Sequence, residues 1–357
     1  MGSRLGNGGA RGSCVRRTGV AALAAVAATL VQTPVHATGP PQRIEEHVEV
    51  RRVLLDARVV DRFGQPILGL TRDDFRVLVD GEPAELETIE WVTAAEPYPP
   101  TATTKAAVPT VNASLPGRLI VFFFQADFAA VRLTGHMRMK AKAIEFLNSL
   151  KPEDRVAVVS FDSHLKLRQD FTCDRELLTR TIHAAIRFGH EPELQPGPFP
   201  SLARHFDFQA ARRAARPETG LLVTARALKA LPGAKSLVYF GWGLGEFRPP
   251  FVYMGDDYDT ARIELAAGRV TVFAIDVTDA DYHTLEVGLE QVAADTGGFY
   301  AKTNLFPGQA MDRLAGAVAG YYVLVLAVSA DVHGTHSVSV ELTRRKGTVL
   351  ARSVLRD

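Results

Sequence analysis

The sequence predicts an α/β fold: a doubly wound, mainly parallel sheet, flanked by an antiparallel β module made from both ends of the chain. Runs that are apolar at nearly every position predict strands buried on both faces, as in a parallel sheet. Segments with helical spacing separate these runs, as crossover connections require. Shorter strands with alternating polarity and tight turns lie near both ends, which is typical of antiparallel sheets. The apolar runs are 119–124, 155–161, 235–240 and 270–275.

The first of these runs is expected to be the central strand. It is apolar from residue 119 to 124 and then ends abruptly in Gln125, Ala126 and Asp127. Ligands of open α/β sheets bind at the carboxyl ends of the strands. Gln125 and Asp127 are therefore the first candidate site residues.

Residues 1–37 predict a secretory signal peptide. Arginines, including the pair Arg16 and Arg17, precede an apolar run at 20–31, and a small-residue cleavage site ends at Ala37. A run of ~12 residues is too short to span a bilayer. We expect an exported protein without a transmembrane segment after signal removal. The sequence leaves open Sec or twin-arginine export, and periplasmic or extracellular location.

The composition is that of an ordinary folded protein, with 46% apolar and 23% charged residues and a net charge of +1. This balance gives no electrostatic footprint for nucleic acid. Of the two cysteines, Cys14 lies in the predicted signal peptide. Cys173 alone cannot form an internal disulfide, and we expect it to be a small buried residue.

Four further segments follow the signal peptide. Residues 44–93 predict a small β module, with an Asp80-Gly81 hairpin turn. Residues 94–117, rich in Pro, Ala and Thr, predict a linker. Residues 118–320 hold the parallel sheet, and 321–357 add antiparallel strands that we expect to pack with the N-terminal module in one sandwich.

Helices are expected between the buried strands. Thr172 is the expected N-cap of the helix that follows it, and Gly268 is an expected helix stop. The segment 241–250 is rich in Gly and Pro and predicts a loop. The other expected helices cover 137–150, 208–215, 221–231, 260–267 and 285–296, the last of which is the last clear helix.

Residues 118–326 resemble the von Willebrand factor type A domain, in the bacterial secreted subgroup known as von Willebrand factor A-related. The matching stretches include RLIVFFFQAD, LNSLKPEDRVAVVSF, LKALPGAKSLVYF and LEQVAADTGGFYAKTNL, and the N-terminal module resembles the usual preamble of that subgroup. The resemblance implies a Rossmann-like sheet. It also implies a role in protein–protein contact or adhesion, often through a bound divalent cation.

The sequence departs from the family at its metal-ion-dependent adhesion site. The family site uses D-x-S-x-S after the first strand, a Thr from a second loop and an Asp after a later strand. Here Gln125, Asp127 and Ala129 stand at the three positions of the first segment. The loop expected to supply Thr, 188–201, contains none, and Gly241-Trp242-Gly243 stands where the Asp is expected. Mg²⁺ needs several oxygen ligands, so we predict a degenerate site and no resident cofactor.

Two alternatives remain beside this interpretation. One is a Mg²⁺ ion held by a rearranged set, Asp127 and Asp162 with waters. The other is a hydrolase that uses Asp162 and a histidine, since Asp162-Ser163-His164 follows a buried strand. In a triad the nucleophile contacts the base and the base contacts the acid, and adjacent residues on an extended chain cannot be arranged in space in this way. Gln125 and Asp127 are expected to bond loop backbone instead.

Two acidic groups are expected to be structural. Asp276 and Asp279 follow the fourth run and are expected to cap loops. Asp256, Asp257 and Asp259 lack the ligand pattern of a calcium loop and are expected in a solvated loop.

Aromatic residues gather after the third run, at Trp242, Phe247, Phe251 and Tyr253. They either form an exposed patch or fold back over the sheet edge. Aromatic residues are enriched in interface cores. We therefore predict a non-enzymatic protein-binding module that presents Gln125, Asp127, Asp162 and these aromatic residues to a protein partner.

Overall fold

The computed structural model describes residues 50–93, 117–126, 130–186, 191–194, 196–304, 306–329 and 334–356. The predicted signal peptide, most of the predicted linker, and Asp127 and Ala129 lie outside these ranges.

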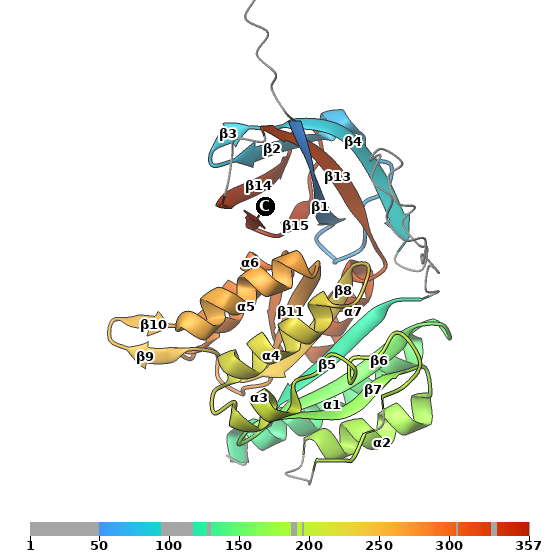
Figure 1. The fold of residues 1–357 in the computed structure, drawn as a ribbon, viewed down its shortest axis with the longest axis vertical. Helices are drawn as coiled ribbons and strands as arrows, with labels where there is room; N and C mark the ends of the chain where they lie inside the picture. The colour runs from blue at the N-terminus through green and yellow to red at the C-terminus, as the bar shows by residue number, and fades with distance from the viewer. Residues whose placement is uncertain are drawn as a thin grey trace, which may run out of the picture. The chain divides into compact units, whose positions relative to one another are not determined.

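A six-stranded sheet carries the predicted apolar runs. Its strands are β5 (Leu119–Gln125), β6 (Arg155–Phe161), β7 (Leu165–Thr172), β8 (Lys235–Gly241), β11 (Val270–Asp276) and β12 (Tyr300–Lys302). They lie in the order β12-β11-β8-β5-β6-β7. All neighbours are parallel except β6 and β7, which are antiparallel at the edge. The predicted fold class is confirmed, with β5 inside the sheet (Figure 1).

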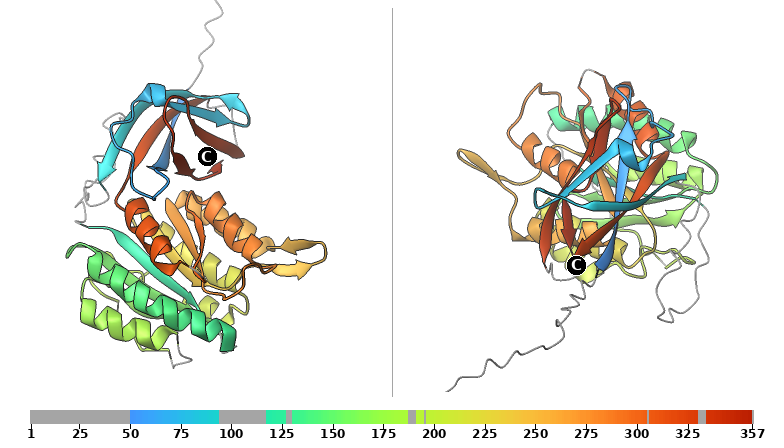
Figure 2. Two further views of the ribbon diagram at one scale, coloured as in Figure 1. Left: turned by 180° about the vertical axis from the view of Figure 1, so that it is seen from behind. Right: turned by 90° about the horizontal axis from the view of Figure 1, so that it is seen from above.

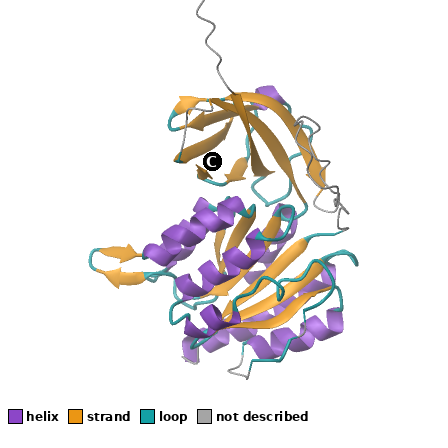
Figure 3. Cartoon of the chain, viewed as in Figure 1, coloured by secondary structure: helices purple, strands orange, loops and turns teal. Residues whose placement is uncertain are grey.

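Helices cover both faces of this sheet, as Figure 3 shows. The helices are α1 (Ala130–Ser149), α2 (Arg175–Ala185), α3 (Phe208–Arg213), α4 (Pro217–Lys229), α5 (Asp256–Ala267), α6 (Glu286–Asp295) and α7 (Pro307–Ala317). Alternate residues of β5 face opposite sides: Phe122 packs in the cluster of α1, α2 and α7, and Phe123 in the cluster of α3 to α6. Every residue of β5 is buried, because a strand covered on both faces has no polar side.

Four helices differ from the prediction. α4 and α5 begin earlier than expected, at Pro217 and Asp256 rather than at residues 221 and 260. α1 begins at Ala130 rather than at residue 137. Its first turns contain Gly135, and a Cβ there would come within 1.5 Å of the backbone oxygen of Val277, so close packing requires this weak helix former. α7 was not predicted, because its Ala- and Gly-rich sequence carries a narrow apolar stripe that includes Met311 and Leu314, both buried.

Three local predictions are also corrected. The N-cap of α2 is Asp174, whose Oδ1 accepts from the backbone N–H of Leu177 at 2.9 Å, and not Thr172. Cys173, beside this cap, is exposed rather than buried. The acidic group that begins at Asp256 forms the first turn of α5 rather than a loop. Carboxylates are stabilised there by the helix dipole.

The antiparallel β module is built from both ends of the chain, as predicted. Its two sheets have the orders β15-β1-β13-β4 and β16-β14-β2-β3. Their side chains share one core, in which Tyr322 packs against Phe75 and Trp91. The N-terminal elements are β1 (Val50–Val60), the 3₁₀ turn η1 (Arg72–Asp74), β2 (Phe75–Val79), β3 (Glu82–Pro83) and β4 (Glu85–Thr93). The C-terminal elements are β13 (Gly320–Ser329), β14 (Thr335–Leu342), β15 (Thr348–Ala351) and β16 (Val354–Arg356).

The module contacts the amino ends of the parallel strands. Arg269, just before β11, pairs with Asp56 of β1 through two contacts of 2.6 and 2.9 Å. Arg58 of β1 donates to Thr271 Oγ1 at 2.8 Å. Figures 1 and 2 show the module at this end of β8 and β11. The carboxyl ends of the strands lie at the opposite edge of the sheet and hold the candidate site.

Candidate functional site

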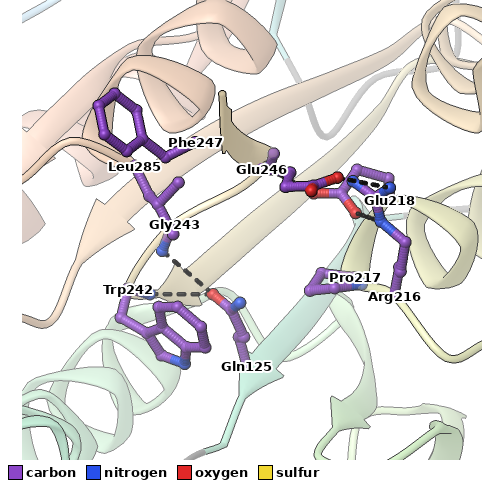
Figure 4. A pocket seen from close by; sticks show the side chains of 10 residues that line it. Gln125, Arg216, Pro217, Glu218, Trp242, Gly243, Glu246, Phe247 and Leu285 are labelled. Carbon is purple, nitrogen blue, oxygen red and sulfur yellow. Dashed lines mark hydrogen bonds and ion pairs between the residues drawn. The ribbon is translucent and has the colours of Figure 1, made fainter. Parts of the chain in front are cut away.

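Gln125 joins the ends of β5 and β8. Its side chain is 1% exposed, and its Oε1 accepts from the backbone N–H groups of Trp242 at 3.0 Å and Gly243 at 3.3 Å (Figure 4). A Cβ at Gly241 would lie 2.7 Å from this oxygen and 2.2 Å from the ring of Tyr239. Glycine at position 241 therefore permits the close approach of the Gln125 side chain to the end of β8. The prediction that Gln125 bonds loop backbone is confirmed; Asp127 lies outside the described residues.

The amide nitrogen of Gln125 faces a pocket. Because Oε1 receives two N–H groups, the orientation of the amide is determined by its hydrogen bonds. Nε2 is buried and has no hydrogen-bond partner within the described structure, and neither has Nε1 of Trp242. Both residues line a pocket of about 480 Å³ together with Pro217, Phe247 and Leu285. Both N–H groups are buried in the wall of this pocket and are free to donate to an acceptor oxygen that reaches them.

The start of α4 forms another wall of this pocket. Arg216 donates to Glu218 Oε2 at 3.2 Å, and Glu218 also accepts from the backbone of Gly245. The resemblance to the family implies that the loop 188–201 would supply a Thr side chain at this edge of the sheet. The described end of that loop packs elsewhere, since Ser201 Oγ donates to Asp170 of β7 at 2.6 Å. The start of α4, and not the described end of that loop, lines the pocket. Spacing alone did not show which part of the long connection returns to the sheet edge.

Trp242 stands between two pockets. The guanidinium carbon of Arg132, on α1, lies 3.6 Å from the centroid of the Trp242 ring, which is cation–π geometry. A second pocket of about 510 Å³ is lined by Arg132, Trp242, Thr278, His283 and Leu285, among others. Trp242 and Leu285 line both pockets.

Asp162, after β6, is neutralised inside the protein. Its side chain is 1% exposed, and Lys166 Nζ lies 2.6 and 2.8 Å from its two oxygens. Burial raises the pKa of Asp162, but the hydrogen bonds from Lys166 and Ser163 outweigh it, and the pKa lies below its usual value. The prediction that Asp162 presents its carboxylate to a partner does not fit this geometry. Its ion pair also leaves it a poor ligand for a second cation.

The Asp162-Ser163-His164 sequence does not form a triad. Ser163 Oγ lies 3.0 Å from Asp162 Oδ1 and 3.0 Å from His164 Nδ1. The Ser163 hydroxyl therefore lies between the carboxylate of Asp162 and the imidazole of His164. In a triad the acid orients the histidine, and here the carboxylate is bound to Lys166 instead.

The predicted aromatic loop is a hairpin of two short strands, β9 (Glu246–Arg248) and β10 (Phe251–Tyr253). Phe251 is 74% exposed, Phe247 50% and Tyr253 42%. Figure 1 shows the hairpin extending away from the helices. Of the two alternatives, exposure is correct for these three side chains, whereas Trp242 is partly buried and packs against the core. The partly buried Val252 packs on the core instead, so the hairpin is anchored on one side.

A polar cluster lies after β11. As predicted, Asp276 caps a loop, because its Oδ1 accepts from the backbone N–H of Thr278 at 2.9 Å. Its Oδ2 also lies 2.8 Å from His283 Nε2 and 2.8 Å from the hydroxyl of Tyr300. The hydroxyl is in turn 3.3 Å from Glu286 Oε2.

Sequence analysis missed His283, Glu286 and Tyr300. They come from a loop, a helix start and the next strand, so no motif spacing links them. Asp279, predicted with Asp276, pairs instead with Arg138 of α1 at 2.7 Å.

Comparison with known proteins does not assign a family. No family model and no curated protein matches the sequence. Solved structures with partial similarity include BatB from Bacteroides thetaiotaomicron, at 11% identity over 56% of this chain and 96% of that one, with a TM-score of 0.36. Human COPII-coat protein Sec24c matches at 11% identity over 67% and 44%, with a TM-score of 0.40.

Proximal thread matrix protein 1 from the mussel byssus, with a zinc-occupied MIDAS motif, matches at 16% identity over 57% of this chain and 48% of that one, with a TM-score of 0.37. Similarities of this size carry no conclusion about partners or ions. The resemblance to the von Willebrand factor type A family stays a prediction.

Proposed function

We propose that this chain is an exported, non-enzymatic protein-binding module that presents the carboxyl edge of its parallel sheet to a protein partner, without a standard metal site. The observation that carries the proposal is the exposure of Phe247, Phe251 and Tyr253 on one short hairpin beside a pocket. Isolated exposed apolar residues are common on protein surfaces. Three exposed aromatic rings on one hairpin, of which Phe247 also lines a pocket, form the kind of surface from which interface cores are made.

The pocket supplies polar specificity next to these rings. Phe247 lines the pocket in which Gln125 Nε2 and Trp242 Nε1 have no partner among the described residues. A buried donor left unpaired costs about 1–3 kcal/mol. A partner whose carbonyl or carboxylate oxygen reached these N–H groups, after the pocket wall had moved to uncover them, would remove that cost. Aromatic contact on the hairpin and an acceptor group in the pocket therefore describe one binding surface.

The geometry favours binding without Mg²⁺ at the end of β5. Gln125 is neutral, and its Oε1 already accepts two backbone N–H groups. Asp162 is paired with Lys166. The alternative with Asp127 and Asp162 requires the ion to compete with that pair. Titration of the mature protein with Mg²⁺ in a calorimeter distinguishes binding without an ion from this alternative. Heat of Mg²⁺ binding that disappears in Asp127→Ala would support the alternative.

The same contacts favour a binding protein over a hydrolase. Ser163 and His164 touch, but the carboxylate beside them is held by Lys166 rather than by the imidazole.

The described helices include no candidate membrane span. Export itself rests on the predicted signal peptide.

Site-specific photo-crosslinking tests the proposed surface. A photoreactive phenylalanine analogue at position 251 should crosslink to one discrete protein of the source organism's cell envelope. The band should weaken in Trp242→Ala and Phe247→Ala. The control places the analogue at Phe63, which is 64% exposed in a turn of the β module. Equal products from both positions, or a band indifferent to both substitutions, would reject the surface.

A further inference from the structure

We propose that Asp276, His283 and Glu286 bind a divalent transition-metal ion of the Zn²⁺ type, at a site separate from the end of β5. One ligand atom from each of the three residues lies within 4.8 Å of the others. Ligand atoms this close can reach a single ion after small movements of the side chains. The proposal does not depend on the proposed protein-binding function.

The donor set selects the class of ion. Two carboxylates and one imidazole suit Zn²⁺, Co²⁺ or Mn²⁺, whereas Mg²⁺ prefers oxygen ligands and several waters. The positions are also well supported. Asp276 is the last residue of β11 and is 1% exposed, and Glu286 is the first residue of α6 and is 6% exposed. His283 lies in the loop that joins them.

The charge balance leaves room for a cation. Asp276 and Glu286 are both buried, and each touches the hydroxyl of Tyr300. Lys302 Nζ, 2.8 Å from Glu286, is the positive partner of the pair. The two buried carboxylates therefore share one ammonium partner, Lys302, among the described contacts. Buried charge is costly unless it is compensated, and a divalent ion supplies that compensation.

A second observation lies at the same place. The hydroxyl oxygen of Thr278 is buried and has no hydrogen-bond partner within the described structure. Thr278 and His283 line the same pocket of about 510 Å³, and the backbone N–H of Thr278 bonds Asp276. The pocket gives an ion and its waters access to His283, one of the three proposed ligands. The unpaired hydroxyl belongs to a second residue that lines this pocket.

The present contacts can rearrange around an ion without unfolding the site. His283 Nε2 and the Tyr300 hydroxyl now share Asp276 Oδ2, and an ion would take the place of the His283 contact. Lys302 also donates to the backbone oxygen of Asp281, so it keeps a partner when it leaves Glu286.

Calorimetric titration with Zn²⁺ tests the site on the mature protein, prepared without a histidine tag and stripped of metal. The expected result is one bound ion per chain. Binding should weaken in His283→Asn and in Glu286→Gln by more than the roughly 10- to 100-fold that loss of an outer-shell partner causes, because each variant changes a direct ligand. Circular dichroism establishes that the variants are folded. The absorption spectrum of the Co²⁺ form gives an independent reading of nitrogen and oxygen ligation.

The chain offers a matched control. His336 Nδ1 lies 2.7 Å from Asp80 Oδ2 in the β module, which is also a histidine–carboxylate contact. His336→Gln should leave Zn²⁺ binding unchanged. Absence of binding up to millimolar Zn²⁺, Co²⁺ and Mn²⁺ would overturn the proposal. So would binding that survives both cluster substitutions, or that is lost only in Asp127→Ala or His336→Gln.

Discussion

The side-chain oxygen of Gln125 accepts a hydrogen bond of 3.0 Å from the backbone N–H of Trp242, which ties the carboxyl end of one core strand to the loop that follows its neighbour. A second bond reaches Gly243 at 3.3 Å. One neutral side chain thereby organises the edge at which the pocket opens.

Gln125→Leu should destabilise the protein by about 1–3 kcal/mol, because two buried backbone N–H groups lose their acceptor. Urea denaturation measures the change. Gln209→Leu, at an exposed position on α3, is the control and should shift stability by less than about 0.5 kcal/mol. Equal effects of the two substitutions would show that the Gln125 bonds contribute little.

Lys235→Met should stabilise the protein at pH 6 by roughly 1–4 kcal/mol. Burial and, to a smaller extent, the nearby charge of Arg269 lower the pKa of Lys235 to about 7. The unfolded chain keeps its ordinary pKa, so wild-type stability should rise as the pH increases from about 7 to about 10.

Urea midpoints of Lys235→Met and wild type measured from pH 6 to 10 test this expectation. The advantage of Lys235→Met should shrink as the pH rises, since the wild-type lysine is then neutral in the folded state and no longer a buried charge. An advantage that does not change with pH would contradict the assignment of a buried ammonium group.

Asp154 should make the protein sensitive to acid. Its side chain is fully buried beside Arg118. Burial raises the pKa of Asp154, but hydrogen bonds from the side chain and backbone of Arg118 outweigh it and lower the pKa below its usual value. A depressed carboxyl pKa stabilises the fold above about pH 4, and this contribution is lost as the pH falls through the folded-state value.

Denaturation of Asp154→Asn between pH 7 and 2.5 measures this contribution. The variant should be less stable than wild type at pH 7, and the difference should narrow in acid. Asp312→Asn, at an exposed position on α7, should follow the wild-type curve. Parallel curves for Asp154→Asn and wild type would refute the assignment.

Phe251→Ala and Tyr253→Ala should each leave the free energy of unfolding within about 0.5 kcal/mol of wild type. Both rings are exposed on the hairpin and are not part of the core. Thermal denaturation provides the test, and Phe123→Ala should cost about 3–5 kcal/mol as the buried comparison. A large loss for either hairpin variant would mean that these rings support the fold rather than a partner.

The strand predictions succeeded for a local reason. A strand covered on both faces needs an apolar side chain at every position, and the run that became β5 shows this directly. The sequence did not predict the start of α1 or any of α7. Gly135 and the small residues of α7 allow close packing and do not form the broad apolar stripe that predicts a helix. Packing partners of this kind do not appear in a local pattern.

The sequence by itself determined the buried strands, the antiparallel character of both chain ends and the presence of an amide at the end of β5. Each follows from side-chain type and short-range spacing, which act within a few residues of the chain. Only the tertiary structure decided that Lys166 neutralises Asp162, that the hairpin aromatics are exposed, and that Asp276 meets His283 and Glu286. These contacts depend on how strands and loops are placed in space, because hydrogen bonding and charge act over ångströms whatever the separation along the chain.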